Sequence, residues 1–268
     1  MNKGTLSNLF RSLGLMHLID NIRYFYYKNK NKKANQEFKN KYPNIKLPPD
    51  YLIYESFQIN YNEYYTKSRE SAQWLIDNFR KHIPLESGNI LDWGCGPGRI
   101  IRHFPELLGE KFNIYGTDYN ERSIDWCKNN LENINFNHNG LEANLPYNEN
   151  HFDVIFAISI FTHLSEEKHY EWFNELLRTM KPGGIFFFST HGNAFFNKLS
   201  ETEKRKFKNG EIIERGSVTE GHRVYTAFHP DAFMHKLLKD VKILEHVEQP
   251  EPTTGKHQQD IWIIQKPE

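Results

Sequence analysis

The stretch Asn89–Arg99, with the sequence NILDWGCGPGR, constrains the fold more than any other part of the chain. It begins with apolar residues expected of a short buried strand and continues with three glycines at alternate positions: Gly94, Gly96 and Gly98. Glycine adopts positive φ readily and lets a ligand approach the main chain closely. A strand, a glycine loop and a helix N-terminus form a cradle whose N–H groups favour a polar, anionic ligand. The sequence therefore predicts a ligand-binding loop here.

Strands and helices alternate in the chain around this loop. The expected strands cover 89–93, 113–117, 134–136, 153–159, 185–190, 241–246 and 261–264, and the expected helices cover 68–82, 98–108, 121–130, 166–180 and 231–238. This order predicts an α/β fold with a Rossmann-like, doubly wound, mostly parallel seven-stranded sheet. Residues 191–229 break the alternation. We expect them to form a lid or substrate-contact insertion over the carboxyl ends of the strands, and a surface insertion without a role in chemistry is the alternative.

Residues 1–66 are expected to form an N-terminal helical extension and linker before a ligand-binding domain at 67–268. Residues 1–46 carry ten basic and two acidic side chains, which is a net charge of +8. Since the whole chain has 34 of each sign, the remainder carries −8. Apolar residues at helical spacing over 5–28 followed by KNKNKK favour a helix packed on the main domain or on a second subunit, and a basic segment on an anionic membrane face is the alternative.

The bulk composition narrows the class of protein. The balanced total charge gives no reason to expect a nucleic-acid partner. Two cysteines, Cys95 and Cys127, imply no disulfide framework and fit a reduced cytoplasmic setting. Charged residues interrupt the apolar residues near the N-terminus, and the longest apolar run, Val154–Phe161, is too short to span a bilayer. We therefore expect a cytoplasmic protein that, under the membrane alternative, sits peripherally at the inner face of the membrane.

Acidic residues on both sides of the glycine loop indicate the ligand class. Asp92 precedes Gly94 by two positions, and Asp118 ends the second expected strand, twenty residues after Gly98. A carboxylate at that position can accept both hydroxyls of a ribose, but the glycine spacing lacks the pyrophosphate pattern of a dinucleotide site. The loop suits a nucleoside, and a nicotinamide dehydrogenase is the weaker alternative.

The chain resembles the class I S-adenosylmethionine-dependent methyltransferases in four segments: ILDWGCGPGR, YGTDYN, LPYNENHFDVIFAISIFTHL and RTMKPGGIFFFSTHG. The resemblance covers about Ser68 to the end of the chain and implies S-adenosyl-L-methionine as cofactor. FTHL and THG are also similar to a bacterial subgroup associated with surface-polysaccharide or related glycan biosynthesis. This second resemblance is the basis for expecting a glycan acceptor.

The resemblance assigns the cofactor contacts to particular residues. Asp92, Gly94, Cys95, Gly96 and Gly98 would hold or shape the site of the methionine part. Asp118 would bind the ribose and Tyr119 would pack on the adenine. The adenine amino group would be bound within 139–142, where Asn139, Gly140 and Leu141 are candidates; Leu141 stands near a position at which the family often has Asp, so Asn139, Glu142 or a backbone carbonyl must replace it. Ile158 and Ser159 would lie under the sulfonium.

Three histidines are candidate general bases for a sugar hydroxyl, because histidine titrates near neutral pH. His163 follows the fourth expected strand, His191 follows the fifth, and His229 closes the insertion. A histidine that bonds a loop or caps a helix is the alternative for each. After the fourth expected strand, the next acidic residues are Glu166 and Glu167, which lie too far along the chain to form a carboxylate cluster at the strand's end. We therefore expect no metal ion in the reaction.

The sequence therefore predicts a methyltransferase that acts on a sugar hydroxyl of a glycan, glycolipid or sugar nucleotide. An N- or O-methyltransferase of a small metabolite is one alternative. A non-catalytic S-adenosylmethionine-binding subunit that supports a partner enzyme is another. The methylated atom and the oligomeric state are not specified by the sequence.

Overall fold

The computed structural model describes residues 15–216, 220–221, 224–253 and 256–268. The first part of the apolar stripe expected over 5–28 therefore lies outside the described residues. The chain divides into two compact units, one consisting of Met16–Asn139 and the other containing Gly140–Glu268. In the described part of the chain, no helix is both long and apolar enough to cross a bilayer.

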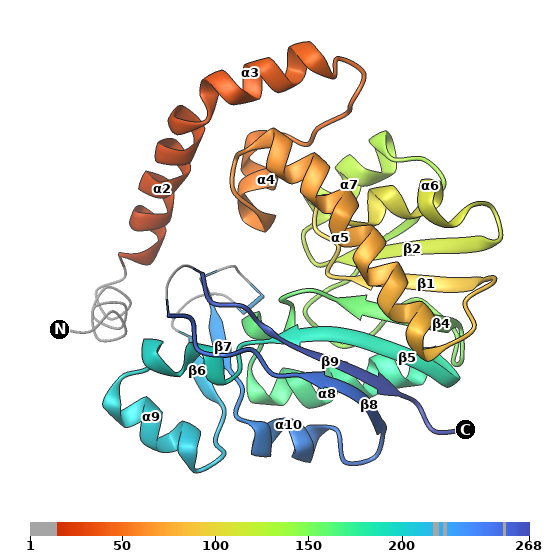
Figure 1. The fold of residues 1–268 in the computed structure, drawn as a ribbon, viewed down its shortest axis with the longest axis vertical. Helices are drawn as coiled ribbons and strands as arrows, with labels where there is room; N and C mark the ends of the chain where they lie inside the picture. Colours follow the sequence, from red (N-terminus) through yellow and green to blue (C-terminus); the bar gives the residue numbers. More distant parts are fainter. Residues whose placement is uncertain (1–14, 217–219, 222–223, 254–255) are drawn as a thin grey trace. The chain divides into compact units, whose positions relative to one another are not determined.

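Seven strands form one sheet (Figure 1): β1 (Gly88–Trp93), β2 (Phe112–Asp118), β3 (Asn135–His138), β4 (Phe152–Ala157), β5 (Met180–Thr190), β8 (Lys242–Val247) and β9 (Asp260–Gln265). Their order is β3-β2-β1-β4-β5-β9-β8. The pairs β3–β2, β2–β1 and β4–β5 are parallel, whereas β5–β9 and β9–β8 are antiparallel. The mostly parallel seven-stranded sheet with flanking helices confirms the predicted fold class.

In the unit Met16–Asn139, the helices that connect the strands are η1 (Ile101–His103), α6 (Phe104–Leu108) and α7 (Glu121–Asn130). The limits of α7 are those predicted, because the Asn120 side chain caps it by accepting the Ser123 N–H. The single helix expected over 98–108 is wrong. Pro105 has no N–H to bond the carbonyl of Ile101, so a 3₁₀ turn precedes a short α-helix.

The same unit begins with the helices α2 (Met16–Lys30), α3 (Lys32–Lys41), α4 (Asp50–Ser56) and α5 (Tyr61–His82). Helix α5 begins at Tyr61 rather than at Ser68, because Asn60 accepts the Glu63 N–H as its N-cap. The expected domain limit after residue 66 thus falls inside a continuous helix. These helices share an aromatic core made of Phe38, Ile53, Tyr54, Ile59, Tyr61 and Tyr64.

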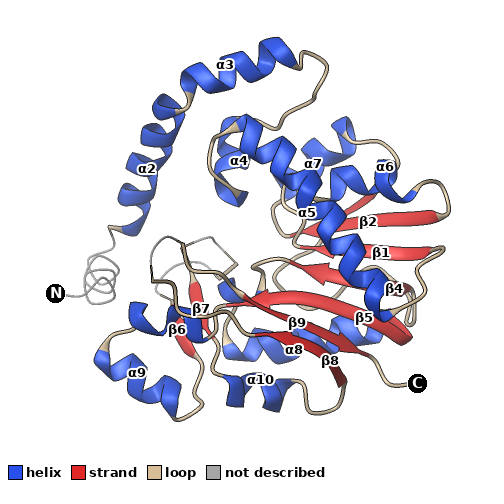
Figure 2. Ribbon diagram, viewed as in Figure 1, coloured by secondary structure: helices blue, strands red, loops and turns tan. Residues whose placement is uncertain are grey.

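In the unit that contains Gly140–Glu268, α8 (Glu166–Thr179) packs on β5, as Figure 2 shows. Ser165 caps α8 through the Lys168 N–H. Strand β5 begins at Met180 rather than at 185, since Phe152 of β4 pairs with Met180 before the register shifts to Val154 and Ile185. Helix α8 ends before Lys181–Gly184, and this segment forms an irregular part of β5.

The insertion at 191–229 contains η3 (Asn193–Lys198), α9 (Glu201–Lys208), β6 (Ile213–Arg215) and β7 (Thr226–Phe228), and α10 (Asp231–Leu237) follows it. The strands β6 and β7 form an antiparallel pair. The insertion has its own apolar core of Ala194, Phe195, Leu199, Phe207, Ile213 and Phe228. Strand β7 packs on η2 (Phe161–His163), and the Gly221 N–H donates to the His163 carbonyl at 2.9 Å. The insertion therefore covers the segment that follows β4, and its role as a lid stays a prediction.

Candidate functional site

Three glycines of the loop after β1 have backbone angles in the left-handed, positive-φ region. Gly94, Gly96 and Gly98 have φ of 80°, 53° and 70°, which side chains rarely adopt. The N–H groups of Gly94 and Cys95 both donate to the carbonyl of Thr117, at 2.8 and 2.9 Å. The loop is thus held to the end of β2, as a preformed cradle requires.

Gly98 is also required for steric reasons. A Cβ atom at this position would lie 2.5 Å from Cδ1 of Leu131 and 3.2 Å from Sγ of Cys127. Cys95 and Cys127 are both buried, and burial raises the pKa of each thiol. Both cysteines therefore act as small apolar groups that support the loop.

Asp118 at the end of β2 fastens the loop from the other side. Its Oδ2 accepts the Gly96 N–H at 2.8 Å, and its Oδ1 accepts the Asn120 N–H at 2.8 Å. Burial raises the pKa of the carboxyl, and the hydrogen bonds from Asn120 and Gly96 oppose that rise. Each carboxylate oxygen has a second lone pair. The side chain can therefore accept two ribose hydroxyls while it keeps both backbone contacts.

Asp92 lies one residue before the end of β1 and is 5 % exposed. Burial raises the pKa of its carboxyl well above the usual range, Arg99 lowers it, and Asp118 raises it further. A cationic ligand group beside Asp92 would relieve this cost, since opposite charges favour the ionised carboxylate. The amino group of a bound amino acid fits that requirement.

Tyr119 and Asn139 lie beside Asp118. The Tyr119 side chain is 38 % exposed, and its carbonyl accepts a hydrogen bond from Nε2 of His138 at 3.0 Å. Asn139 is buried and donates its N–H to the Asp118 carbonyl at 3.1 Å. A partly exposed aromatic ring next to the ribose-type carboxylate suits the expected packing on a flat base, although the cofactor contacts of both residues stay predictions.

Two contacts from the N-terminal helices support the loop and were missed in the sequence. The Tyr64 hydroxyl of α5, which is fully buried, donates to the Pro97 carbonyl at 3.2 Å. Arg102 donates to the Lys46 carbonyl at 2.6 Å and stacks on the Tyr65 ring. The density of tyrosines over 51–65 was the available signal, but nothing local in the sequence pairs them with a loop thirty residues away. The N-terminal segment is thus part of the cradle's support.

In the unit that contains Gly140–Glu268, β4 ends in a polar cluster. Ser159 has φ of 66°, a conformation uncommon for a side-chain-bearing residue. Its N–H donates to Oγ of Ser189 at 2.9 Å, and both serine hydroxyls donate to Oε1 of Gln259, at 2.9 and 2.6 Å. Gln259, just before β9, was not anticipated because its partners lie 70 and 100 residues away. Such strain commonly marks functional positions.

The other expected cofactor residues of this unit take simpler positions. Gly140 is exposed, and Ile158 is half-buried next to Ser159. The Leu141 carbonyl accepts the Trp172 indole N–H at 3.2 Å. The assignment of these residues to the cofactor stays a prediction.

His163 has a defined tautomer. Its Nδ1 lies 2.8 Å from the Tyr225 carbonyl in the insertion. A carbonyl only accepts, so Nδ1 carries the hydrogen, and in the neutral ring Nε2 carries the lone pair. His163 is half-buried, and Nε2 is the ring atom through which it would act as a base.

His191 shows the same tautomer in a less suitable environment. Its Nδ1 lies 3.0 Å from the Ala227 carbonyl, and its ring packs on Phe195 at 4.1 Å between centroids. Burial lowers the pKa of His191 to about 3, although the Ala227 carbonyl opposes that shift. Such a ring stays neutral near pH 7, but it is a weak base.

His229 lies in the core, 1 % exposed. Its Nε2 is 2.9 Å from Nε2 of His169, whose Nδ1 donates to the Ser165 carbonyl at 2.6 Å. His169 therefore accepts at Nε2 and His229 donates to it. Burial lowers the pKa of both rings, to about 4 for His169. This burial argues against the catalytic role expected for His229 and points to packing.

Comparisons with known proteins show which family the segment around the glycine loop resembles. Residues 90–184 match a family model described as "Methyltransferase domain". A malonyl-[acyl-carrier protein] O-methyltransferase of Ilyobacter polytropus is 33 % identical over 122 residues, 43 % of this chain and 44 % of that protein. A tRNA N(3)-methylcytidine methyltransferase of Schizosaccharomyces pombe is 29 % identical over 171 residues, 58 % and 53 % of the two chains. The matched segments span roughly a quarter to a half of such relatives.

Solved structures show the same fold. A structure of an S-adenosylmethionine-dependent methyltransferase of Methanosarcina mazei superposes with a TM-score of 0.54 at 18 % identity, covering 72 % of this chain and 97 % of that one. The glycopeptide N-methyltransferase MtfA, complexed with S-adenosyl-L-methionine, superposes with a TM-score of 0.51 at 13 % identity, covering 75 % and 94 %. At these identities the likeness establishes the fold. The acceptors that these proteins' names give are diverse.

Proposed function

We propose that the protein is a class I S-adenosylmethionine-dependent methyltransferase, because residues 90–184 match a family model described as "Methyltransferase domain". The observation that carries this proposal is the Asp118 carboxylate, which fastens the Gly96 loop and keeps lone pairs for a ribose. A protein that only needed a tight turn would not require a second buried carboxylate, Asp92, at the same loop.

The residues of the loop fit S-adenosyl-L-methionine. When bound, this cofactor supplies a methyl group that is already activated on a sulfonium. Asp118 would accept the ribose hydroxyls, and Asp92 would compensate the charge of the amino group. Tyr119 would cover the adenine. What the protein then contributes is orientation of the acceptor and exclusion of water.

We propose a sugar hydroxyl of a glycan, glycolipid or sugar nucleotide as the acceptor. A sugar hydroxyl is a poor nucleophile near pH 7 and benefits from a base. The tautomer of His163, fixed by the Tyr225 carbonyl, supports such a role, since Nε2 can take the hydroxyl proton. The likeness of FTHL and THG to glycan methyltransferases supports the sugar. A small-metabolite amine would need no such base, because a neutral amine is itself nucleophilic.

A cytoplasmic protein that rests on the inner face of the membrane is part of the same proposal. Helix α2 exposes Leu18, Ile22 and Phe25 at 58 %, 61 % and 61 %. Lys28 and Lys30 lie in its last turn. Exposed apolar residues with a basic flank favour an anionic bilayer surface.

Transfer of labelled methyl from S-adenosyl-L-methionine to a cell-envelope extract tests the acceptor. Label in a sugar fraction, lost with the Asp118→Ala variant, supports the proposal. Label in an amine or another small metabolite would replace the sugar by that acceptor. Tight cofactor binding without label in any acceptor would favour a non-catalytic subunit. Mass comparison of polysaccharide from wild-type and deletion strains, searching for a lost methyl group, would identify the site of methylation.

A further inference from the structure

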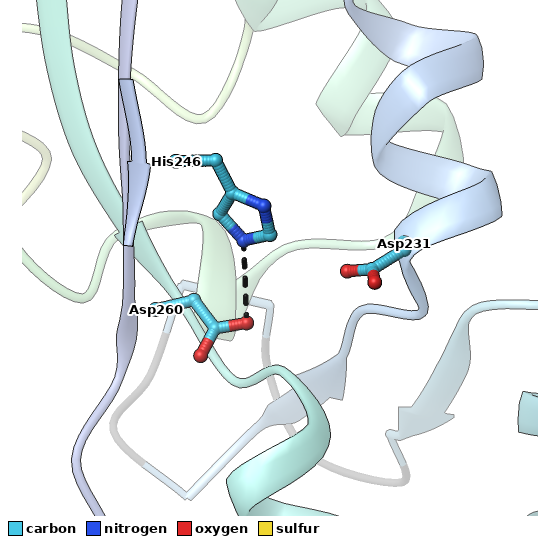
Figure 3. Close-up of side chains that lie close together, drawn as sticks. All are labelled: Asp231, His246 and Asp260. Atoms are coloured by element: carbon cyan, nitrogen blue, oxygen red, sulfur yellow. Dashed lines mark ion pairs between the residues drawn. The ribbon is translucent and has the colours of Figure 1, made fainter. Parts of the chain in front are cut away.

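Three side chains with metal-ligating atoms converge in the unit that contains Gly140–Glu268, outside the residues assigned to methyl transfer. They are Asp231 at the start of α10, His246 in β8 and Asp260 at the start of β9, and Figure 3 shows them facing one another. One ligand atom from each lies within 4.8 Å of the other two. Nε2 of His246 lies 3.7 Å from Oδ2 of Asp260.

The fold holds two of these side chains in place before any ligand binds. Asp260 is 1 % exposed, and its Oδ1 accepts the Gln249 N–H at 2.9 Å, which leaves Oδ2 directed at His246. The His246 ring stacks on Trp262, with 3.5 Å between centroids and 11° between planes. A Cβ at residue 192 would lie 1.8 Å from Oδ2 of Asp260, so only glycine fits there.

The polar groups of this cluster are incompletely satisfied. Nε2 of His246 is sealed from solvent and has no hydrogen-bond partner within the described residues. An uncompensated buried nitrogen is costly. One carboxylate oxygen of Asp231 and one of Asp260 lie within 4.8 Å of each other. The cluster thus combines an orphaned imidazole nitrogen with crowded carboxylates.

We propose that Asp231, His246 and Asp260 bind a divalent transition-metal ion, such as zinc. Two carboxylates and one imidazole form a donor set that such ions accept, with water completing the coordination. Ligand atoms around a zinc ion with bonds of about 2.0–2.1 Å lie roughly 3.4 Å apart. The ligand atoms, which lie within 4.8 Å of one another, therefore need to approach by up to about 1.4 Å. The Asp231 side chain on α10 can supply that movement.

The ion would have a structural role at the base of the insertion. Gly192, where the insertion begins, touches Asp260, and Asp231 follows the insertion's end. One ion therefore ties α10 and the β8–β9 pair to both ends of residues 191–229. A cavity of about 730 Å³ is lined in part by Asp231, Glu248 and Gln249, so one of the three ligands borders open space.

Zinc binding to the full chain tests this site. The protein is stripped with a chelator, freed of it, and titrated with zinc chloride by calorimetry, and melting curves are recorded with and without zinc. The variants are Asp231→Asn and His246→Gln. His235→Gln is the matched control, because His235 lies one turn along α10 and bonds the Asp231 carbonyl through Nδ1.

We expect one zinc per chain and a higher melting temperature with zinc. Each ligand variant should lower the affinity at least about tenfold, because even the outer partners of metal ligands contribute 10–100-fold. His235→Gln should bind as the wild type does. Absence of stoichiometric binding, or equal affinity in all four proteins, would overturn the proposal and leave an ordinary histidine–carboxylate pair. Two ligand variants on different elements keep the test valid if one fails to fold.

Discussion

The Asp118 carboxylate accepts the Gly96 N–H at 2.8 Å, which joins the end of β2 to the middle of the loop after β1. One side chain thus combines two roles, because the carboxylate that would recognise a ribose also fixes the loop that would hold the rest of the cofactor. Loss of Asp118 should therefore change both cofactor affinity and fold stability.

Replacement of Asp118 by asparagine separates these contributions. Asparagine has one oxygen, so either the Gly96 or the Asn120 N–H would face an amide NH₂. An unsatisfied buried donor costs about 1–3 kcal/mol, partly offset here by removal of a buried charge. The dissociation constant for S-adenosyl-L-methionine should rise about 10- to 100-fold, since hydrogen bonds to charged groups are worth about 1.5–3 kcal/mol.

Calorimetry measures the affinity and urea unfolding measures the stability. Asp125→Asn, an exposed carboxylate on α7, is the control and should change neither quantity. An unchanged dissociation constant in Asp118→Asn would remove the ribose role while leaving the structural one.

Gly98→Ala tests whether the loop geometry itself matters. Gly98 and Gly109 both have positive φ, 70° and 78°, and Gly109 has ψ of −174°, a region that is essentially restricted to glycine. Alanine should therefore lower the free energy of unfolding at both positions. Only at Gly98 does the new Cβ also meet other atoms, Cδ1 of Leu131 at 2.5 Å. Gly98→Ala should weaken cofactor binding, whereas Gly109→Ala should not. Equal effects of both changes on binding would show that crowding at Gly98 is unimportant.

The start of a helix could be predicted from the sequence where it depends on the residue directly before it. Asn120 and Ser165 are caps directly before α7 and α8, and both helices begin where predicted. The single helix expected over 98–108 is interrupted, because Pro105 has no N–H to bond the carbonyl of Ile101. The early start of β5 at Met180 could not be read locally, since it depends on pairing with β4.

The same distinction applies to the candidate site. One short segment of the chain, which runs from β1 through the glycine loop to the end of β2, contains Asp92, the three glycines and Asp118. Their convergence could therefore be predicted. Gln259 bonds Ser159 across 100 residues, and nothing local in the sequence indicates that pairing. The burial of His229 against His169 likewise depends on how the insertion folds back on α8. Sequence position made all three histidines candidates, and only the structure shows that His229 is buried whereas His163 and His191 are half-buried.

His163→Gln should reduce turnover about 100-fold or more, the usual contribution of a general base, with cofactor affinity unchanged. Glutamine can still donate an N–H toward the Tyr225 carbonyl, but it cannot accept a proton. Steady-state rates on the true acceptor and calorimetry with S-adenosyl-L-methionine measure the two quantities.

His235→Gln, an exposed histidine on α10, is the control for His163→Gln and should retain full turnover. Full turnover by His163→Gln would reject the base. A loss confined to KM would instead indicate acceptor binding.

The buried histidine pair should make stability depend on pH. Burial lowers the pKa of His169 from 6.5 to about 4, so the unfolded chain binds a proton that the folded chain excludes between these values. Stability from this residue is therefore complete above about pH 6.5 and is lost as pH falls toward 4. The difference of 2.5 pH units corresponds to about 3 kcal/mol.

His169→Gln removes this titration, because glutamine stays neutral and can still bond both His229 and the Ser165 carbonyl. Urea titrations measure the free energy of unfolding of both proteins. The wild-type value minus the variant value should decrease by about 3 kcal/mol from pH 7 to pH 4. His235→Gln, at an exposed position on α10, is the control variant. A constant difference for His169→Gln would mean that His169 takes up its proton at the same pH in the folded and unfolded chains, which would contradict the effect of its burial.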